Sequence, residues 1–484
     1  MDKQPKSIKK NYIYNVCYQI LLLITPLITT PYVSRVLGAD NIGIYSYTNS
    51  IVSYFAMFAV LGTGIYGQRE ISYFQDDRQS RSRAFWSTFL LRCLATAAAV
   101  AAYMVFISLQ TKYKILYVIL AINLIAVAAD VSWFFQGMEE FGKIVGRNVV
   151  FKLLNIMFIF IFVRQKSDLP VYIAGICILT LLSNISLWPY LKKYICRVPV
   201  SEMRIGANLG TVLSLFIPTV AIQVYTVLDK TMIGAITKDA FQNGYYEQAE
   251  KISKMALTVV TSLGTVMIPR IGYYFAQGRK DDVRLYMYRS YRFVWFMGIP
   301  LSLGLIGIAS NLVPWFFGTG YEGVVPVLRV LSLLILAIGI SNVTGLQYLI
   351  PTQRQNLFTL SVSLGAIVNF TCNYFMIQRW AAVGAAVASV IAEAVIAVYQ
   401  LCLVKKELDG LRVICMSVHY WIAGGAMALV LYFESVRFTP GILHTFEMIL
   451  TGAAVYFGML LILRDAFFIE NMKKIIHRLI NIRQ

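Results

Sequence analysis

The residues of this sequence whose types and spacing suit chemistry form a polar row in the middle of the chain. They recur at intervals of three and four within a largely apolar segment: Glu247, Lys251, Lys254, Thr258, Thr261 and Thr265. These intervals place side chains on one face of a helix, so this face is polar for most of its length. Two neighbouring lysines repel each other unless something anionic or aqueous lies between them. We therefore favour a water-filled cavity over a polar contact between helices.

Other ionisable residues also fall inside apolar segments or at their ends. The acidic ones are Asp229, Glu247 and Glu393, and the basic ones include Arg35, Lys230, Arg270 and Arg329. Such residues are costly in a membrane and mark function unless they neutralise one another. The carboxylates are candidates for binding a coupling ion, a proton or Na⁺, although Glu393 suits a hydrogen bond to a neighbouring helix equally well. Arg35 also suits an interfacial position.

Arg92 and Asp130 form a separate candidate pair. Each lies several residues from the same end of its own apolar segment. At about 1.5 Å per residue, they reach a similar depth on consecutive antiparallel helices. We expect a structural salt bridge between them.

The composition indicates that membrane-spanning helices position all these residues. Of 484 residues, 58% are hydrophobic and 14% are charged, whereas soluble domains carry roughly 25% charged residues. The apolar stretches are each near the roughly 20 residues that a helix needs to cross a bilayer, and a backbone in lipid must bond to itself. Fourteen spans are predicted, at about 11–35, 42–65, 84–109, 115–136, 146–163, 170–191, 207–233, 247–270, 290–310, 323–346, 356–378, 381–404, 415–434 and 441–463. The predicted fold is an all-α integral membrane protein.

The basic residues predict the orientation of these spans. The net charge is +19, but lysine and arginine lie mainly in short loops and not on one basic surface, which argues against a nucleic-acid partner. If the N-terminus is cytoplasmic, 30 of the 43 lysines and arginines lie on the inner side and 8 on the outer side. The other five lie in spans or at their ends. An excess of basic residues in cytoplasmic loops is typical of membrane proteins. We expect both termini to be cytoplasmic.

An internal repeat predicts the domain organisation. Leu61-Gly62-Thr63, Arg69, Asp76-Asp77 and Trp86 recur in the same order as Leu263-Gly264-Thr265, Arg270, Asp281-Asp282 and Trp295. Both copies follow an even-numbered span, so the repeat is parallel. It predicts two pseudo-symmetric six-helix lobes, 1–206 and 207–410, around a central cationic cavity. The remainder, 411–484, adds two further spans and an amphipathic cytoplasmic tail.

Motifs for enzymatic chemistry are missing from the sequence. It contains no nucleotide-binding G-x-x-x-x-G-K-[ST] motif, and neither H-E-x-x-H nor G-x-S-x-G. The seven cysteines show no spacing typical of a metal site. We therefore expect no enzyme, no resident cofactor and no metal.

Several motifs resemble the Wzx-type oligosaccharide flippases of the polysaccharide transport family, in the multidrug, oligosaccharidyl-lipid and polysaccharide exporter superfamily. The matching residues run from Pro26 through Pro31, Arg35 and Gly38 to Tyr45, then continue at Arg69-Glu70, Leu228-Asp229-Lys230, Gly244 to Glu247 and Pro269-Arg270. The resemblance implies a multi-pass protein of the bacterial inner membrane that acts in lipopolysaccharide or capsule biosynthesis. It would move a polyprenyl-diphosphate-linked oligosaccharide to the outer leaflet by ion-coupled alternating access.

The implied substrate suits the candidate residues. A diphosphate pairs with lysine and arginine, and sugar hydroxyls need polar partners such as Thr258 and Thr261. Membrane lipids, a polysaccharide polymerase and assembly proteins are the implied partners. Two alternatives remain: a drug or cation exporter of the same superfamily, and a membrane polysaccharide polymerase or ligase.

Overall fold

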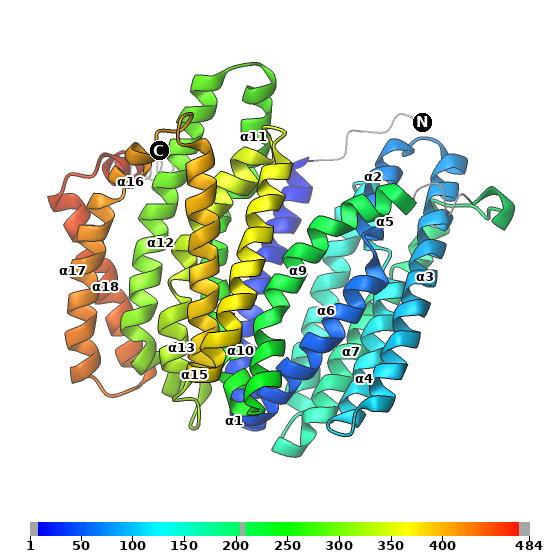
Figure 1. The fold of residues 1–484 in the computed structure, drawn as a ribbon, viewed down its shortest axis with the longest axis horizontal. Helices are drawn as coiled ribbons and strands as arrows, with labels where there is room; N and C mark the ends of the chain where they lie inside the picture. Colours follow the sequence, from blue (N-terminus) through cyan, green and yellow to red (C-terminus); the bar gives the residue numbers. More distant parts are fainter. Residues whose placement is uncertain (1–7, 204–208, 474–484) are drawn as a thin grey trace, which may run out of the picture. The chain divides into compact units, whose positions relative to one another are not determined.

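The computed structural model describes residues 8–203 and 209–473, and it is helical almost throughout (Figure 1). The chain divides into two compact units, 1–231 and 232–484. The division falls inside a helix, α9 (Leu209–Thr237), whereas the sequence places the lobe boundary before that helix, at 206/207. The further separation of a six-helix lobe from two added spans stays a prediction.

The described part of the first unit contains nine α-helices if the shared α9 is included. The other eight are α1 (Ile8–Val60), α2 (Thr63–Tyr73), α3 (Arg78–Leu109), α4 (Lys114–Ala129), α5 (Ser132–Gly137), α6 (Phe141–Phe162), α7 (Leu169–Ile185) and α8 (Trp188–Leu191). The described part of the second unit contains α10 (Ala240–Thr261), α11 (Gly264–Ala276), α12 (Lys280–Phe317), α13 (Val324–Leu331), α14 (Leu334–Ser341), the π-helix η3 (Asn342–Leu349), α15 (Gln355–Val404), α16 (Gly410–Cys415), α17 (Val418–Arg437) and α18 (Ile442–Ile462).

These helices account for the predicted spans. Among the described residues, eleven helical ranges are long and apolar enough to cross a membrane. Two of them contain a bend inside one helix, at Gly38 in α1 and at Ala381 in α15, and each bend separates two predicted spans. With α9, which covers the described part of the predicted span at 207–233, the described parts of all fourteen spans lie in helices. The chain is an all-α, multi-pass integral membrane protein.

The bend in α1 depends on glycine. Gly38 has φ 81°, a left-handed conformation that favours glycine. The segment after α6 holds both sides of the bend, because the Tyr32 hydroxyl donates to the Val163 carbonyl at 2.8 Å and the Asn41 amide donates to the Lys166 carbonyl at 2.8 Å. The angle between the two spans of α1 is therefore fixed from outside the helix.

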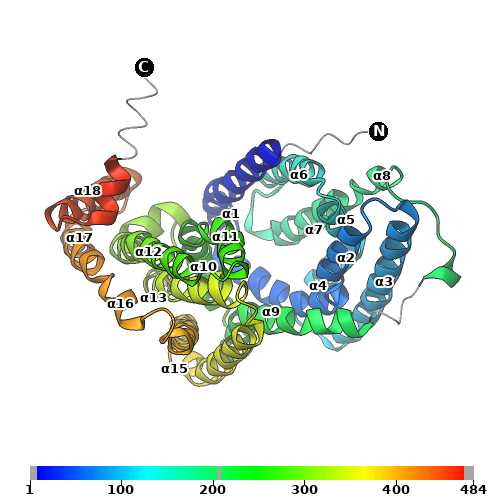
Figure 2. The same ribbon diagram turned by 90° about the horizontal axis from the view of Figure 1, so that it is seen from above.

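The core of the first unit is aromatic. Figure 2 shows α2, α4 and α5 between α3 and α7. Helix α4 packs directly against both α3 and α7. The Phe85 ring of α3 lies 5.5 Å from Trp133 and 5.4 Å from Phe134 between ring centres. Burial of such rings contributes strongly to stability, so α5 is fixed against α3.

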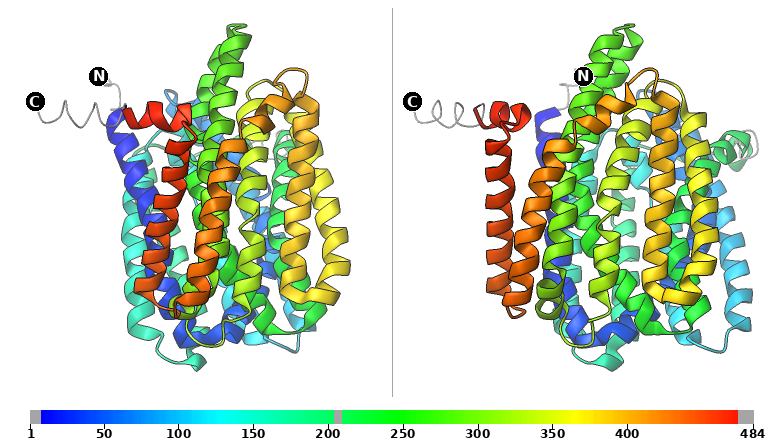
Figure 3. Two further views of the ribbon diagram at one scale, coloured as in Figure 1. Left: turned by 90° about the vertical axis from the view of Figure 1, so that its left-hand side faces the viewer. Right: turned by 60° about the vertical axis from the view of Figure 1, so that its left-hand side comes forward.

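The core of the second unit forms around α12, which packs against α14, α17 and α18. At 1.5 Å per residue, its 38 residues span roughly 57 Å, well beyond the roughly 30 Å hydrocarbon core of a bilayer. In Figure 3 its first turns and the end of α11 rise above the other helices of this unit. The predicted C-terminal tail is helical over its described part, 466–473, and Ile475 to Ile480 lie outside the described residues.

The bend in α15 gives a test of helix packing. A Cβ atom on Gly384 would lie 2.1 Å from the Met376 carbonyl oxygen, a backbone atom that cannot turn aside, whereas a Cβ on Gly425 of α17 would meet nothing within 4 Å. Gly384→Ala should therefore lower the thermal unfolding midpoint in detergent, through overpacking of about 1–3 kcal/mol. The matched control Gly425→Ala should leave the midpoint unchanged or raise it slightly, because alanine favours a helix. Equal midpoints for the two variants would contradict the packing at this bend.

Candidate functional site

The predicted polar row lies on α10 from Glu247 to Thr261, whereas Thr265 belongs to the next helix, α11. The two lysines of the row are paired on α10. The helix begins after Asp239, whose carboxylate accepts from the Phe241 amide at 2.9 Å. Lys251 Nζ lies 3.3 Å from Glu247 Oε1, and Lys254 Nζ lies 2.7 Å from Glu250 Oε1. Residues four apart are neighbours on a helix surface. The expected repulsion between the lysines is therefore offset by two glutamates, one of which, Glu250, the sequence analysis overlooked.

The two ends of these ion pairs differ in exposure. The side chains of Glu247 and Glu250 are 11% and 12% exposed, whereas those of Lys251 and Lys254 are 33% and 57% exposed. The carboxylates are thus largely buried, and the ammonium groups reach farther out on flexible stems. An anion that approaches α10 would meet the ammonium groups first.

The hydroxyls of the row bond back to their own helix. Thr258 Oγ1 donates to the Lys254 carbonyl at 2.9 Å, and Thr261 Oγ1 donates to the Leu257 carbonyl at 3.1 Å. Their protons are engaged in these bonds, so both oxygens are left as acceptors. They can accept hydrogen bonds from sugar hydroxyls. The side chain of Thr265 lies outside the described part of the chain.

The interior of the second unit contains a further polar chain that the sequence analysis missed. Asn373 Nδ2 donates to Asn369 Oδ1 at 2.9 Å, and Asn369 Nδ2 donates to Ser389 Oγ at 3.3 Å. Ser389 Oγ also lies 3.4 Å from the Tyr246 hydroxyl of α10. Two asparagines spaced by four inside one apolar span were the available signal, because they share a helix face and bond across helices.

Glu393 of α15 is buried, with 7% of its surface exposed. Ser341 Oγ of α14 donates to Glu393 Oε2 at 3.3 Å. The hydrogen bond to a neighbouring helix is therefore present, and a coupling role for this carboxylate stays a prediction. Among the described residues, no three His, Cys, Asp or Glu side chains come together as a metal site would require.

The remaining predicted site residues are distributed over both units. Arg35 of α1 is exposed, Asp229 of α9 is buried, and Lys230 is half-buried. In the second unit, Arg270 of α11 and Arg329 of α13 are exposed. Of the predicted site residues, Glu247 and Lys251 form an ion pair on α10. The shared central cavity stays a prediction.

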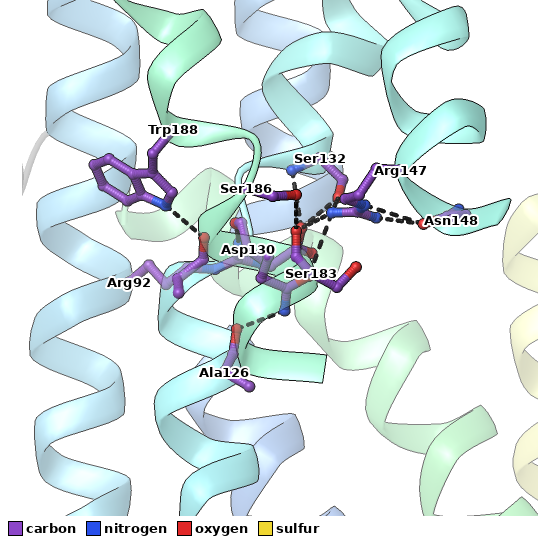
Figure 4. A network of polar contacts seen from close by, with 11 residues as sticks. Arg92, Ala126, Asp130, Ser132, Arg147, Asn148, Ser183, Ser186 and Trp188 are labelled. Atoms are coloured by element: carbon purple, nitrogen blue, oxygen red, sulfur yellow. Dashed lines mark hydrogen bonds and ion pairs between the residues drawn. The ribbon is translucent and has the colours of Figure 1, made fainter. Parts of the chain in front are cut away.

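The predicted salt bridge between Arg92 and Asp130 is wrong in its chemistry. Arg92 is 3% exposed, and its guanidinium donates to the main-chain carbonyl of Asp130 and, at 3.0 Å, to Thr63 Oγ1. The Asp130 carboxylate instead accepts from Ser132, including its amide at 2.9 Å, and lies 4.0 Å from Arg147 Nη1 (Figure 4). The reason is the break between α4 and α5, which turns a carbonyl toward Arg92.

Side chains from other helices occupy the last carbonyls of α4. The final carbonyls of a helix have no partner within it, and inside a membrane they need one. Asn184 Nδ2 donates to the Ala126 carbonyl at 2.7 Å and Trp188 Nε1 donates to the Ala129 carbonyl at 2.8 Å (Figure 4). With Arg92 on Asp130, this network closes the break and has a structural role.

Arg147 belongs to the same network, although it lies only one residue inside the predicted span 146–163 and was not among the candidate residues. It lies in α6, and 10% of its side chain is exposed. Its guanidinium donates to Asn148 Oδ1 at 2.7 Å and to Ser132 Oγ at 3.1 Å. The sequence offered little indication that Arg147 is buried, because α6 begins at Phe141, five residues before the predicted span.

Substitutions in this network distinguish the contact of Arg92 with the Asp130 carbonyl from the contacts of the Asp130 carboxylate. Arg92→Met removes the donor to a buried carbonyl, so it should lower the free energy of unfolding by about 1–3 kcal/mol. Asp130→Asn keeps the carbonyl that Arg92 contacts and weakens only the carboxylate's contacts with Ser132 and Arg147, so its loss of stability should be clearly smaller. Thermal unfolding in detergent compares the two variants. An equal loss for both would mean that the carboxylate, and not the carbonyl, holds Arg92.

Comparison with known proteins agrees with this architecture. Over 419 residues, the chain is 23% identical to a protein of Escherichia coli (strain K12) named "Putative O-antigen transporter", covering 84% of this chain and 99% of the relative. The inward closed conformation of the lipid II flippase MurJ shares the fold, with a TM-score of 0.72, 17% identity and coverage of 94% of this chain and 99% of MurJ.

A multidrug resistance transporter of the MATE family, in the MOP superfamily, has a related fold in its inward-facing conformation. Its TM-score is 0.63 at 11% identity, covering 82% of this chain and 95% of the transporter. These relatives are named as transporters and flippases and not as enzymes, in agreement with the sequence-based expectation.

The family model for polysaccharide biosynthesis proteins matches residues 8–275, more than half of the chain. This match confirms the resemblance on which the sequence analysis relied. The chain belongs to the polysaccharide biosynthesis protein family.

Proposed function

We propose that the protein is a flippase that moves a polyprenyl-diphosphate-linked oligosaccharide from the cytoplasmic to the outer leaflet for surface polysaccharide biosynthesis. The observation that carries this proposal is the pair of ammonium groups on α10, the half-buried Lys251 and the exposed Lys254, within a membrane protein of this family. The named O-antigen transporter and the lipid II flippase support the same class of cargo.

The ion pairs on α10 suit an exchange of partners. Ion pairs between residues four apart on a helix stabilise it by only about 0.2–0.5 kcal/mol. Lys251 and Lys254 can therefore leave their glutamates for a diphosphate at small cost and return after release. The acceptor oxygens of Thr258 and Thr261 lie one and two turns farther along the same helix, where the first sugars can donate to them.

Ion coupling and alternating access are further parts of the proposal. Asp229, Glu247 and Glu393 are buried carboxylates in helices of a membrane protein. Such a group can bind and release a proton or Na⁺ as its surroundings change. The proposed location is the bacterial inner membrane with both termini cytoplasmic, where a polysaccharide polymerase and assembly proteins would receive the product.

The drug or cation exporter is the second candidate, favoured by the MATE fold. A cationic drug needs an acidic surface, but on α10 the glutamates are more deeply buried than their lysine partners. A strain lacking the gene should therefore lose surface polysaccharide and keep its drug resistance. Lost resistance with normal polysaccharide would favour the exporter.

The lysines give the direct test of the flippase. Lys251→Gln combined with Lys254→Gln should leave the protein inserted but reduce surface polysaccharide at least tenfold in cells that depend on it, because charge-assisted bonds contribute about 1.5–3 kcal/mol each. The matched control is Lys405→Gln with Lys406→Gln, two exposed lysines in the loop after α15. Quantitative glycan staining compares the strains at equal protein levels. Unchanged polysaccharide in the α10 variant would exclude this pair as the diphosphate site.

A further inference from the structure

The two copies of the internal repeat share a structural bond. Trp86 Nε1 of α3 donates to the Cys196 carbonyl at 3.0 Å. At the equivalent position, Trp295 Nε1 of α12 donates to the Val413 carbonyl at 3.1 Å. The hairpins α2–α3 and α11–α12 are thus anchored in the same way, each within its own unit.

The second hairpin is longer than the first. From Arg69 to Trp86 the chain advances 17 positions, and from Arg270 to Trp295 it advances 25. The eight additional residues amount to roughly two helical turns. Figure 3 shows this hairpin rising above the other helices of the second unit. Since the shorter hairpin forms the same tryptophan hydrogen bond, the added turns of the longer hairpin are not needed to form that bond.

Two tyrosine rings and three guanidinium groups of this hairpin stack on one another. We call this group the column; its members are Arg270, Tyr274, Arg279, Tyr286 and Arg289. The Tyr274 and Tyr286 rings stack with centres 5.2 Å apart and planes 17° apart. Arg270 and Arg289 lie on Tyr286, with guanidinium carbons 5.5 and 5.6 Å from its ring centre, and Arg279 lies 4.7 Å from the centre of Tyr274. Arginine stacks well on aromatic faces. The column therefore holds its guanidinium groups in place.

The arginines of the hairpin differ in whether a carboxylate neutralises them. Arg279 pairs with Asp282 at 2.7 Å, and Arg284 lies 4.0 Å from Asp281. Among the residues that the structure describes, neither Arg270 nor Arg289 has a carboxylate partner, and both are exposed.

The first repeat differs at the equivalent position. There Arg69 pairs with Glu70 at 3.3 Å, whereas Ile271 follows Arg270. The second unit therefore presents two guanidinium groups, without a neutralising carboxylate, on a single tyrosine ring.

We propose that Arg270 and Arg289, positioned by Tyr286, form a docking site for the diphosphate of the lipid-linked substrate before translocation. This inference rests on the proposed function. Arg270 ends the predicted span 247–270 and Arg289 precedes the predicted span 290–310, so both lie at the level of the membrane surface. A polyprenyl diphosphate carries its phosphates at this level, with the lipid below and the glycan beyond. Each planar guanidinium suits bidentate binding of one phosphate.

Binding of undecaprenyl diphosphate to the full-length protein in zwitterionic nanodiscs tests this site. Arg289→Gln should weaken binding about tenfold, because it removes one charged donor set. Arg289→Lys should give an intermediate loss, since lysine keeps the charge without the planar fork. The matched control Lys280→Gln removes an exposed positive charge from the same hairpin and should change affinity less than twofold.

The outcomes separate this site from the proposed function. If undecaprenyl diphosphate binds the wild type and Arg289→Gln equally, the docking site is wrong and the flippase proposal stands. If the wild type does not bind it at all, both are wrong. The same tenfold loss measured with phosphatidylglycerol as the probe would identify an ordinary anionic-lipid contact and overturn the assignment to the diphosphate. An equal loss for Lys280→Gln would overturn it too, by indicating nonspecific attraction.

Discussion

The structure depends on one constraint: a polar group inside a membrane must find a partner within the protein. The break between α4 and α5 shows how the sequence meets it. Three carbonyls freed at the end of α4 accept hydrogen bonds from Asn184, Trp188 and Arg92, which come from three different parts of the first unit. At this helix break, other helices supply the donors that the freed carbonyls need.

The same constraint organises the charges of the second unit. On α10 the glutamates are covered and their lysine partners reach the surface, so the helix offers positive charge without burying an unpaired ion. At the α11–α12 hairpin, Arg270 and Arg289 are held by the Tyr286 ring in place of a carboxylate. In our proposal the hairpin binds the diphosphate first and the α10 lysines bind it during translocation.

The sequence predicted the helices well and their contacts less well. Hydrophobic length located all fourteen spans, and helical spacing located the polar face of α10. It could not show that Glu250 pairs with Lys254, or that Asp130 turns its carbonyl and not its carboxylate to Arg92, because both depend on side-chain rotation and on a local break. Arg147 and Asn369 were missed because one lay at a span boundary and the other carries no charge. The arrangement of the two units around a shared cavity stays a prediction.

Reconstituted transport tests the central claim most directly. The purified protein is placed in vesicles that contain a fluorescent polyprenyl-diphosphate-linked oligosaccharide, and a membrane-impermeant glycosidase measures how much glycan becomes accessible from the opposite leaflet. We predict that the wild type increases this fraction far above empty vesicles and that the Lys251→Gln, Lys254→Gln variant does not. Accessibility equal to that of empty vesicles, under both proton and Na⁺ gradients, would contradict the flippase account.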